Sequence, residues 1–302
     1  MRILITGATG FVGKNLMPML GKRLPGAQLM TLNRDVEKSK KIYPYKNCWH
    51  VEANDWRAVK EFNPEIVIHL AAMSTSSNDT DIIKPLLTSN ILYGVQLLDT
   101  LKDCKSLSLF INTGSFAEYR FGPSCIKDAY LYAATKSAFR RFLDYYSQLC
   151  GYKYVTVVPY TIYGGKRTIK RLVDYILESN DSVEPVSMTA GEQILDFTHV
   201  DDLCDFYVTL IEKLNVVLTW TNGEEFHVGT GIGNTPKDVA KTIEKLTSKK
   251  CNIHWGARPY RDRDTMHAVA PIAKNLAMLN WRAKISLRDG LRMMMEEQKV
   301  NN

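Results

Sequence analysis

The sequence lacks the features that would direct a protein into a membrane or out of the cell. None of its 302 residues lies in an apolar run approaching the roughly 20 residues that a membrane-spanning helix needs. The first apolar segment, residues 3–5, follows no charged leader and no cleavage site. We therefore expect a cytoplasmic protein with no membrane partner.

Residues that bind metals are also few and scattered. The six cysteines include no C-x-x-C pair, which argues against a zinc site and against a disulfide framework. The six histidines show no pair at ligand spacing. The sequence therefore predicts no metal centre, and it contains neither internal repeats nor low-complexity segments.

Charge of one sign does not dominate the chain. Its 39 Lys and Arg residues against 32 Asp and Glu residues give a formal net charge of +7. A basic stripe with interleaved aromatic residues, as nucleic-acid binding would need, is missing, so we expect no nucleic-acid partner. The surplus fits an anionic small substrate and cofactor, but it fits a slightly basic surface equally well. The length and the 45% hydrophobic content indicate one large globular domain or about two ordinary ones.

The first 35 residues carry the pattern of a strand, a glycine-rich turn, a helix and a second strand. Three glycines at G-x-x-G-x-x-G spacing follow the apolar run of residues 2–6. Such glycines allow a tight turn and a close approach of the backbone to a pyrophosphate, which the N-terminus of the next helix faces. The predicted dinucleotide-binding turn consists of Gly7, Thr9, Gly10, Phe11, Val12 and Gly13.

The residues that follow the second predicted strand, residues 28–32, indicate which dinucleotide is bound. About 20 residues past the glycines, an acidic residue commonly binds the ribose hydroxyls of NAD. This chain has Asn33 and Arg34 there, and an arginine accommodates a 2′-phosphate. Asp35 lies one position too late, although it could still turn inward. We therefore predict NADP(H) as the preferred cofactor, with NAD(H) possible.

Strands alternate with helices through residue 165, which predicts a parallel sheet covered by helices on both faces. Further strands are expected over residues 48–52, 66–70, 107–112 and 154–159, and helices over 81–101 and 130–150. Ligands of such folds lie at the carboxyl ends of the strands. Glu52 or Asp55 is placed there to meet the adenine. The other residues assigned to the cofactor at strand ends are Leu70, Ala71, Ala72, Thr113, Tyr160 and Ile162.

Tyr132 and Lys136 lie four residues apart and therefore share one face of the predicted helix. A nearby ammonium favours a phenolate, so the lysine would let the tyrosine exchange a proton nearer neutral pH. The pattern is weak alone, but a hydroxyl residue, Ser115, stands 17 positions before the tyrosine. Tyr130 competes for the tyrosine role without a lysine at the matching position, and Thr113 is a second candidate for the hydroxyl.

Taken together, these motifs resemble the extended short-chain dehydrogenases/reductases that act on nucleotide-activated sugars. The matching segments are residues 6–13, 69–72, 115–119, 132–136, 163–164 and 196–202. The resemblance implies a Rossmann-type, doubly wound α/β fold with a smaller C-terminal lobe that binds the substrate. It also implies a homodimer formed through the helices near residues 82–101 and 132–149.

The resemblance further implies how the chain divides and what its site residues do. Residues 1–165, rejoined by about 192–230, would form the NADP-binding Rossmann domain. Residues 166–191 and 231–302 would form the lobe that binds the nucleotide sugar. Ser115 would hydrogen-bond the substrate oxygen, Tyr132 would be the general acid/base, and Lys136 would lower the pKa of the tyrosine and hold the nicotinamide ribose.

The same resemblance points to an arginine on the diphosphate of the nucleotide sugar. Arg261 is the first choice and Arg258 the second, because a planar guanidinium suits phosphate. Basic residues from Lys166 and Arg167 onward would open a helix that continues to residue 177, and because they oppose its macrodipole, a bound diphosphate would explain them. A solvated basic face would explain them equally well. The residues assigned to the substrate are Ser115, Phe116, Thr161, Lys166, Arg167, Arg258 and Arg261.

The residues after Ser115 bear on the reaction. Family members that eliminate water follow the catalytic threonine with Asp-Glu, whereas this chain has Phe116 and Ala117. We therefore expect NADPH-dependent reduction of the C4 ketone of a nucleotide-linked 4-keto-6-deoxy sugar, as in deoxysugar synthases such as the CDP-abequose and CDP-paratose synthases. One alternative is a nucleotide-sugar 4-epimerase with tightly bound NAD(P). A second is a non-catalytic dinucleotide-sensing protein.

Overall fold

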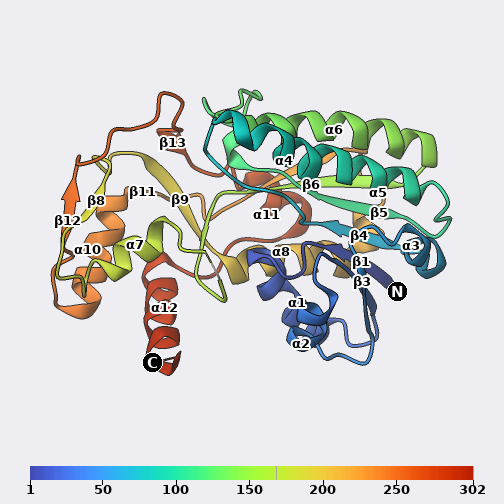
Figure 1. Ribbon diagram of the computed structural model, residues 1–302, viewed down its shortest axis with the longest axis horizontal. Coiled ribbons are helices and arrows are strands. Elements are labelled where there is room, and N and C mark those ends of the chain that lie inside the picture. Colours follow the sequence, from blue (N-terminus) through green and yellow to red (C-terminus); the bar gives the residue numbers. More distant parts are fainter. Residues whose placement is uncertain (168, 302) are drawn as a thin grey trace.

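The computed structural model describes residues 1–167 and 169–301, and a seven-stranded sheet organises the chain (Figure 1). Neighbouring strands all run parallel, in the order β10-β6-β5-β4-β1-β2-β3. The strands are β1 (Arg2–Thr6), β2 (Gln28–Asn33), β3 (Cys48–Glu52), β4 (Ile66–His69), β5 (Leu109–Thr113), β6 (Lys153–Pro159) and β10 (Glu224–Val228). The predicted doubly wound α/β architecture is confirmed.

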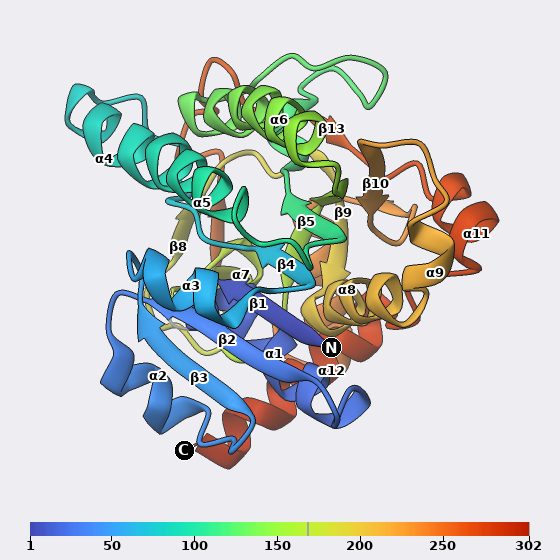
Figure 2. The same ribbon diagram turned by 90° about the vertical axis from the view of Figure 1, so that its right-hand side faces the viewer.

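Successive side chains of the central strands point to opposite faces of the sheet and fill two separate cores. On one face, Ile3 and Ile5 of β1 pack with helices α1 and α8. On the other face, Leu4 packs with α3, α5 and α6 (Figure 2). The bounds of these helices are α1 (Phe11–Arg23), α3 (Trp56–Phe62), α5 (Tyr93–Leu101), α6 (Leu131–Cys150) and α8 (Val200–Glu212).

Two smaller sheets lie at the carboxyl-end side of the main sheet (Figure 1). One contains β7 (Thr161–Tyr163), β9 (Ile194–His199), β11 (Gly233–Asn234) and β13 (His267–Ala268), and the other pairs β8 (Val186–Met188) with β12 (Ile253–Trp255). A third core joins them to α7 (Leu172–Glu178), α10 (Pro236–Thr247) and α12 (Leu287–Asn301). The remaining helices are α2 (Val36–Ile42), α4 (Ile83–Leu87), α9 (Leu214–Val217) and α11 (Ala273–Leu279). In residues 1–167 and 169–301, no helix is both long and apolar enough to cross a membrane.

Two predicted helices differ from those in the structure. The helix expected to open with the basic residues at 166 begins only at Leu172, because Asp174 accepts a hydrogen bond from the backbone N–H of Arg171 (2.8 Å) and caps the helix there. The helix expected over residues 81–101 is interrupted by a π-helical turn, η2 (Thr88–Leu92), between α4 and α5. A π-turn of this kind often marks a functional position.

The side chain of Asn90 uses this π-turn to reach two other segments. Its Nδ2 donates to the carbonyl of Met73 (3.0 Å) and to the hydroxyl of Thr135 (2.9 Å), and its Oδ1 accepts from the N–H of Met73 (2.7 Å). Thr135 directly precedes Lys136 on α6. Asn90 therefore fixes the loop after β4 against the helix that carries Tyr132 and Lys136.

Candidate active site

The glycine-rich turn fits tightly between β1, α1 and the loop after β4. Gly7 has φ +70°, and a Cβ on it would lie 2.7 Å from the backbone nitrogen of Ala71. A Cβ on Gly13 would lie 2.3 Å from the carbonyl oxygen of Ala8. Only glycine fits at either position, so the structure explains both by close backbone approach.

The N-terminus of α1 is open to an anion. No side chain caps this helix at Gly10, and its first turn holds no acidic residue. The first amide groups of a helix have no partner within the helix, and they carry a partial positive charge. The guanidinium of Arg171 lies 4.5 Å from the ring centroid of Phe11, at the same helix start. The turn therefore has the donor groups that a pyrophosphate requires.

The far end of the predicted cofactor site lies beside β2 and β3. The Oδ1 atom of Asn33 is buried there without a hydrogen-bond partner among the described residues, while its Nδ2 donates to the carbonyl of Thr31 (2.8 Å). A cleft of 540 Å³ beside it is lined by Arg34, Asp35, Val36, Glu37, His50, Val51, Glu52 and Asp55. An unpaired acceptor beside a polar cleft suits the adenosine half of a dinucleotide.

The acidic residues of this cleft differ in whether they already accept a hydrogen bond as a helix cap. Asp35 caps α2 by accepting from the N–H of Lys38 (2.8 Å), and Asp55 caps α3 by accepting from the N–H of Ala58 (3.0 Å). Glu52 is exposed at the end of β3. Arg34 is exposed, and within the described residues nothing pairs with its guanidinium.

The strand-end residues assigned to the nicotinamide half lie close to the other end of the turn. Ala71 donates its N–H to the hydroxyl of Thr6 (3.1 Å), so the loop after β4 is tied to β1. The hydroxyl of Thr113 is hydrogen-bonded to that of Tyr207 on α8 (2.7 Å). Because this hydroxyl is engaged in the core, Thr113 is a weaker candidate than Ser115 for contact with a substrate. Leu70 and Ile162 are half-buried, and Ala72 is exposed.

Ser115 stands at the start of a short 3-10 turn, η3 (Phe116–Glu118). Its hydroxyl oxygen accepts from the N–H of Ala117 (3.2 Å), and its own N–H donates to Glu118 (2.7 Å). Tyr132 lies in the first turn of α6, and the nearby hydroxyls of Ser115 and Ser74 act to lower the pKa of its phenol. Because the serine hydroxyl accepts from Ala117, its own proton stays free to be donated.

Burial dominates the proton affinities of Tyr132 and Lys136. Desolvation of the phenol, together with the negative charge of Glu118, raises the pKa of Tyr132 to about 12, although the hydroxyls of Ser115 and Ser74 oppose the rise. Burial of the ammonium lowers the pKa of Lys136 to about 8. Burial, rather than the lysine, therefore dominates the pKa of the tyrosine. Tyr132 therefore holds its proton at neutral pH and can act as an acid.

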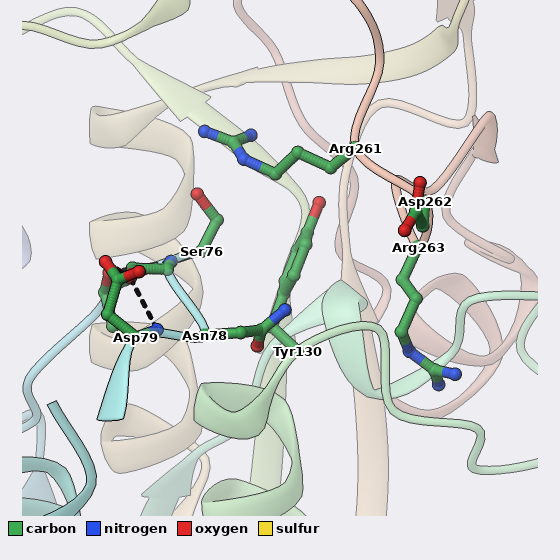
Figure 3. Close-up of a pocket in the computed structure, with 9 residues that line it drawn as sticks. Ser76, Asn78, Asp79, Tyr130, Arg261, Asp262 and Arg263 are labelled. Carbon is green, nitrogen blue, oxygen red and sulfur yellow. Dashed lines mark hydrogen bonds between the residues drawn. The ribbon is translucent and has the colours of Figure 1, made fainter. Parts of the chain in front are cut away.

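A polar cavity of 690 Å³ lies next to Tyr130 (Figure 3). Arg261 extends across it above Ser76, whereas Arg263 points away and donates to the carbonyl of Ala129 (3.1 Å). Tyr130 is hydrogen-bonded to Asp264. The cavity is lined by Thr75, Ser76, Ser77, Asn78, Asp79, Tyr130, Arg261, Asp262 and Arg263.

Phe116 and Thr161, two further residues predicted to contact the substrate, follow the ends of β5 and β6. The rings of Phe116 and Tyr160 stack with centroids 5.8 Å apart, and the Tyr160 hydroxyl is hydrogen-bonded to His227 (3.1 Å). The hydroxyl of Thr161 is buried and has no partner among the described residues. An unpaired buried hydroxyl beside an aromatic pair suits the recognition of a sugar.

The other basic residues assigned to the substrate are not brought to this cavity. Lys166 and Arg167 line a separate cleft of 1240 Å³ beside α1, α7 and α12. Arg167 is paired there with Asp174. Arg258 is exposed, and its backbone N–H donates to the carbonyl of Met188 on β8 (3.0 Å). Of the predicted cations, only Arg261 lies in the polar cavity.

Sequence reasoning did not assign three residues that the structure brings to the site. Ser74 follows the small residues after β4, and nothing in its spacing marked it. Glu118 would point elsewhere if the strand continued past Ser115, but the 3-10 turn directs it back toward Ser115. Arg171 belongs to the basic run that begins at Lys166, and a cation directly before an amphipathic helix is a usable signal.

Comparisons with known proteins agree with this geometry. A family model described as the NAD dependent epimerase/dehydratase family matches residues 3–229. The CDP-abequose synthase of Salmonella typhimurium is 29% identical over 304 residues, covering 96% of this chain and 95% of that protein. The UDP-glucuronate 4-epimerase of Thermodesulfobacterium geofontis is 24% identical and covers 99% and 96%.

Solved structures show the same fold over the whole chain. A mutant UDP-glucuronic acid 4-epimerase from Bacillus cereus, in complex with a fluorinated UDP-sugar and NAD, superposes with a TM-score of 0.88 at 20% identity and covers 100% of both chains. The Thermus thermophilus UDP-glucose 4-epimerase in complex with NAD gives 0.83 at 23% identity and covers 99% of both chains.

Proposed function

The chain belongs to the NAD dependent epimerase/dehydratase family of extended short-chain dehydrogenases/reductases, and on that premise we propose that it reduces the C4 ketone of a nucleotide-linked 4-keto-6-deoxy sugar with NADPH. Membership makes it an NAD(P)-dependent oxidoreductase or epimerase that uses a nicotinamide cofactor. The observation that carries the choice of reduction is Tyr132, a buried phenol that keeps its proton beside a serine whose own proton is free to be donated. The similarity to CDP-abequose synthases supports the same choice.

In this proposal the protein polarises the carbonyl of the substrate and supplies one proton. Ser115 donates a hydrogen bond to the ketone oxygen, and Tyr132 transfers its phenolic proton to that oxygen as the carbon is reduced. The ammonium of Lys136 stabilises the phenolate that remains on Tyr132. When bound, the nicotinamide supplies the hydride. The ketone gains one hydride and one proton and becomes an alcohol.

The proposed cofactor contacts follow from the turn and the cleft at its far end. The glycine-rich turn and Arg171 hold the pyrophosphate, because open helix amides and a guanidinium both suit phosphate. Asn33 and Arg34 hold the adenosine ribose and its 2′-phosphate, and Glu52 or Asp55 meets the adenine. Leu70, Ala71, Ala72, Thr113, Tyr160 and Ile162 remain the proposed neighbours of the nicotinamide half.

The proposed sugar site lies between Ser115 and the polar cavity. Phe116 and Thr161 contact the sugar, and Arg261 binds the diphosphate from the cavity. Arg258 remains a second choice, since its exposed side chain lies outside the cavity lining. Lys166 and Arg167 are kept as weaker candidates because they line a different cleft.

An absorbance assay of NADPH tests the proposed function. Purified protein is mixed with NADPH and, in turn, with CDP-, dTDP-, UDP- and GDP-linked 4-keto-6-deoxy sugars. Rapid loss of the reduced-nicotinamide band with one of them is expected, and it would identify the nucleotide. Interconversion of a plain nucleotide hexose at constant absorbance would instead establish the alternative, a 4-epimerase, which the epimerase relatives and the NAD-bound structural neighbours favour.

We also propose the division of the chain expected from its sequence. The main sheet takes β1 to β6 from residues 1–165, and it takes β10 from the returning segment of about 192–230. Helix α8 of that segment packs against α1 of the first. Residues 166–191 and 231–302 supply most of the third core and would form the lobe that binds the nucleotide sugar.

A homodimer through α4, α5 and α6 is a further part of the proposal. Large apolar side chains are exposed on α4, on α6 and on the π-turn that follows α4, namely Ile83, Leu87, Leu92, Phe142, Tyr145 and Leu149. Three of them, at positions 142, 145 and 149, follow one stripe of α6. We expect sedimentation velocity to give a dimer, and the double substitution Tyr145→Arg with Leu149→Glu to give a monomer. A monomeric wild-type protein at micromolar concentration would rule the dimer out.

A further inference from the structure

A buried ion pair lies directly beside Ser115. Glu118, the last residue of η3, is fully buried, and its Oε2 atom lies 2.8 Å from Nε of Arg140 on α6. Its Oε1 atom accepts the backbone N–H of Ser115 (2.7 Å), and the hydroxyl of Ser137 lies 3.3 Å from Oε2. The carboxylate therefore ties the turn that presents the serine hydroxyl to the helix that carries Tyr132 and Lys136.

Arg140 connects this carboxylate to a second one. Its Nη1 atom pairs with Glu225 on β10, which also accepts the hydroxyl of Tyr119 and lies 2.7 Å from Nε2 of His227. A buried charge is costly unless it is paired, and here one arginine is shared by two carboxylates. The Glu225 side contacts the sheet edge, whereas the Glu118 side contacts Ser115. The two carboxylates are therefore matched in charge but differ in what they touch.

Only a glycine at position 114 leaves room for this ion pair. A Cβ on Gly114 would lie 2.6 Å from Oε1 of Glu118 and 2.9 Å from Nη2 of Arg140. A side chain at this position would displace the carboxylate from the Ser115 amide. The glycine before the serine is therefore explained by the ion pair.

Charges around Tyr132 come from three elements. Glu118 of η3 raises the pKa of Tyr132, and Arg171 before α7 lowers it. Tyr207 of α8 also faces the phenol, but burial keeps it neutral. Glu118 is therefore the anion that most favours the protonated form of Tyr132.

Lys136 is surrounded in a similar way. Glu118 raises the pKa of Lys136, and Arg140 lowers it. His69 at the end of β4 also faces the ammonium, and burial lowers its pKa to about 3, so it carries no charge at neutral pH. The same carboxylate, Glu118, therefore favours the protonated form of both Tyr132 and Lys136.

We propose that Glu118 is a positioning residue for the reduction, which fixes the Ser115 hydroxyl through the backbone amide and holds its negative charge on the side of Tyr132 and Lys136. The proposal rests on the roles proposed above for these three residues. It adds a residue that touches none of the reacting atoms and controls the pH range in which they work.

The substitution Glu118→Gln tests this role, with Glu225→Gln as its matched control. Each variant removes one of the two carboxylates on Arg140. Burial lowers the pKa of Lys136 to about 8, below that of Tyr132, so we expect the lysine to set the basic limb of the kcat/KM profile. Removal of the Glu118 charge should move that limb to lower pH by about one unit or more. The control should leave the limb where it is. No shift, or equal shifts in both variants, would overturn the proposal.

A cofactor-free readout separates failure of this proposal from failure of the proposed reaction. NMR titration of protein with 13C-labelled lysine side chains follows Lys136 directly, and the Lys136→Arg variant identifies its resonance. We expect the lysine to titrate at lower pH in Glu118→Gln than in wild type and in Glu225→Gln, whatever the substrate is. An unchanged midpoint would refute the role of Glu118 even if no substrate is found.

Glu118→Asp serves if the glutamine variant does not fold. Aspartate keeps the charge but is too short to reach both Arg140 and the Ser115 amide. The expected result is a several-fold lower kcat with the basic limb unmoved, because the serine is misplaced while the charge remains. A kcat equal to that of wild type would contradict positioning of Ser115 by this residue.

Discussion

Replacement of Tyr132 by phenylalanine is expected to reduce kcat for ketone reduction by about 10²- to 10⁴-fold, the contribution of a positioned general acid. The substitution keeps the ring and removes the one proton that the proposal gives to the substrate oxygen. Water cannot easily replace it, because the phenol is desolvated by its surroundings. Binding of NADPH, followed by its fluorescence, should change by less than about threefold, since the lost hydroxyl faces Ser115 and Ser74.

Tyr130→Phe is the matched control for this experiment. Tyr130 lies two residues earlier and borders the polar cavity, but its hydroxyl is bonded to Asp264 rather than to Ser115. Its loss should therefore lower kcat less than about tenfold. If Tyr130→Phe were the more damaging of the two, the tyrosine assignment would be reversed. If Tyr132→Phe kept wild-type activity, the protein would not use this phenol as an acid.

The sheet could be predicted from the sequence because its strands are buried on both faces. Residues such as Ile3, Leu4 and Ile5 form continuous apolar runs, which a strand of a parallel sheet requires and a surface strand does not tolerate. The predicted strand over residues 48–52 has the same bounds as β3, and the strand over 66–70 ends one residue later than β4. The turn glycines could also be predicted, because no other residue fits where backbones approach this closely.

The parts that sequence reasoning missed depend on contacts between distant segments. The start of α7 was placed too early because its cap is Asp174 acting on Arg171, without the Ser or Thr that normally marks a helix start. The direction of Glu118 could not be predicted, because a strand would continue a two-residue alternation, whereas the chain enters a 3-10 turn after Ser115. Its partner Arg140 stands 22 residues away in the chain, and Glu225, the second carboxylate on that arginine, stands 107 residues away. No local pattern reports such a pairing.

Arg34→Ala is the second substitution with a large expected effect, and it concerns the choice between NADPH and NADH. Hydrogen bonds to a charged group contribute roughly 1.5–3 kcal/mol, and each 1.4 kcal/mol corresponds to a factor of ten. Loss of the guanidinium should therefore raise KM for NADPH by roughly 10- to 100-fold. KM for NADH should change less than about threefold, because NADH has no 2′-phosphate.

The structure indicates that Arg34→Ala alters the cofactor site without breaking an interaction inside the protein. Asp35, the carboxylate that could have bound ribose hydroxyls, caps α2 through the N–H of Lys38. The Arg34 guanidinium has no partner within the described residues, so its removal breaks no internal ion pair. Lys38→Ala is the matched control, since it removes an exposed cation of α2 that does not line the cleft.

Equal rises in KM for both cofactors in Arg34→Ala would mean that Arg34 binds a group common to NADH and NADPH. In that case Asn33 and Asp35 would be read as an NAD site, and the epimerase alternative, which retains its cofactor through a full cycle, would become the stronger account.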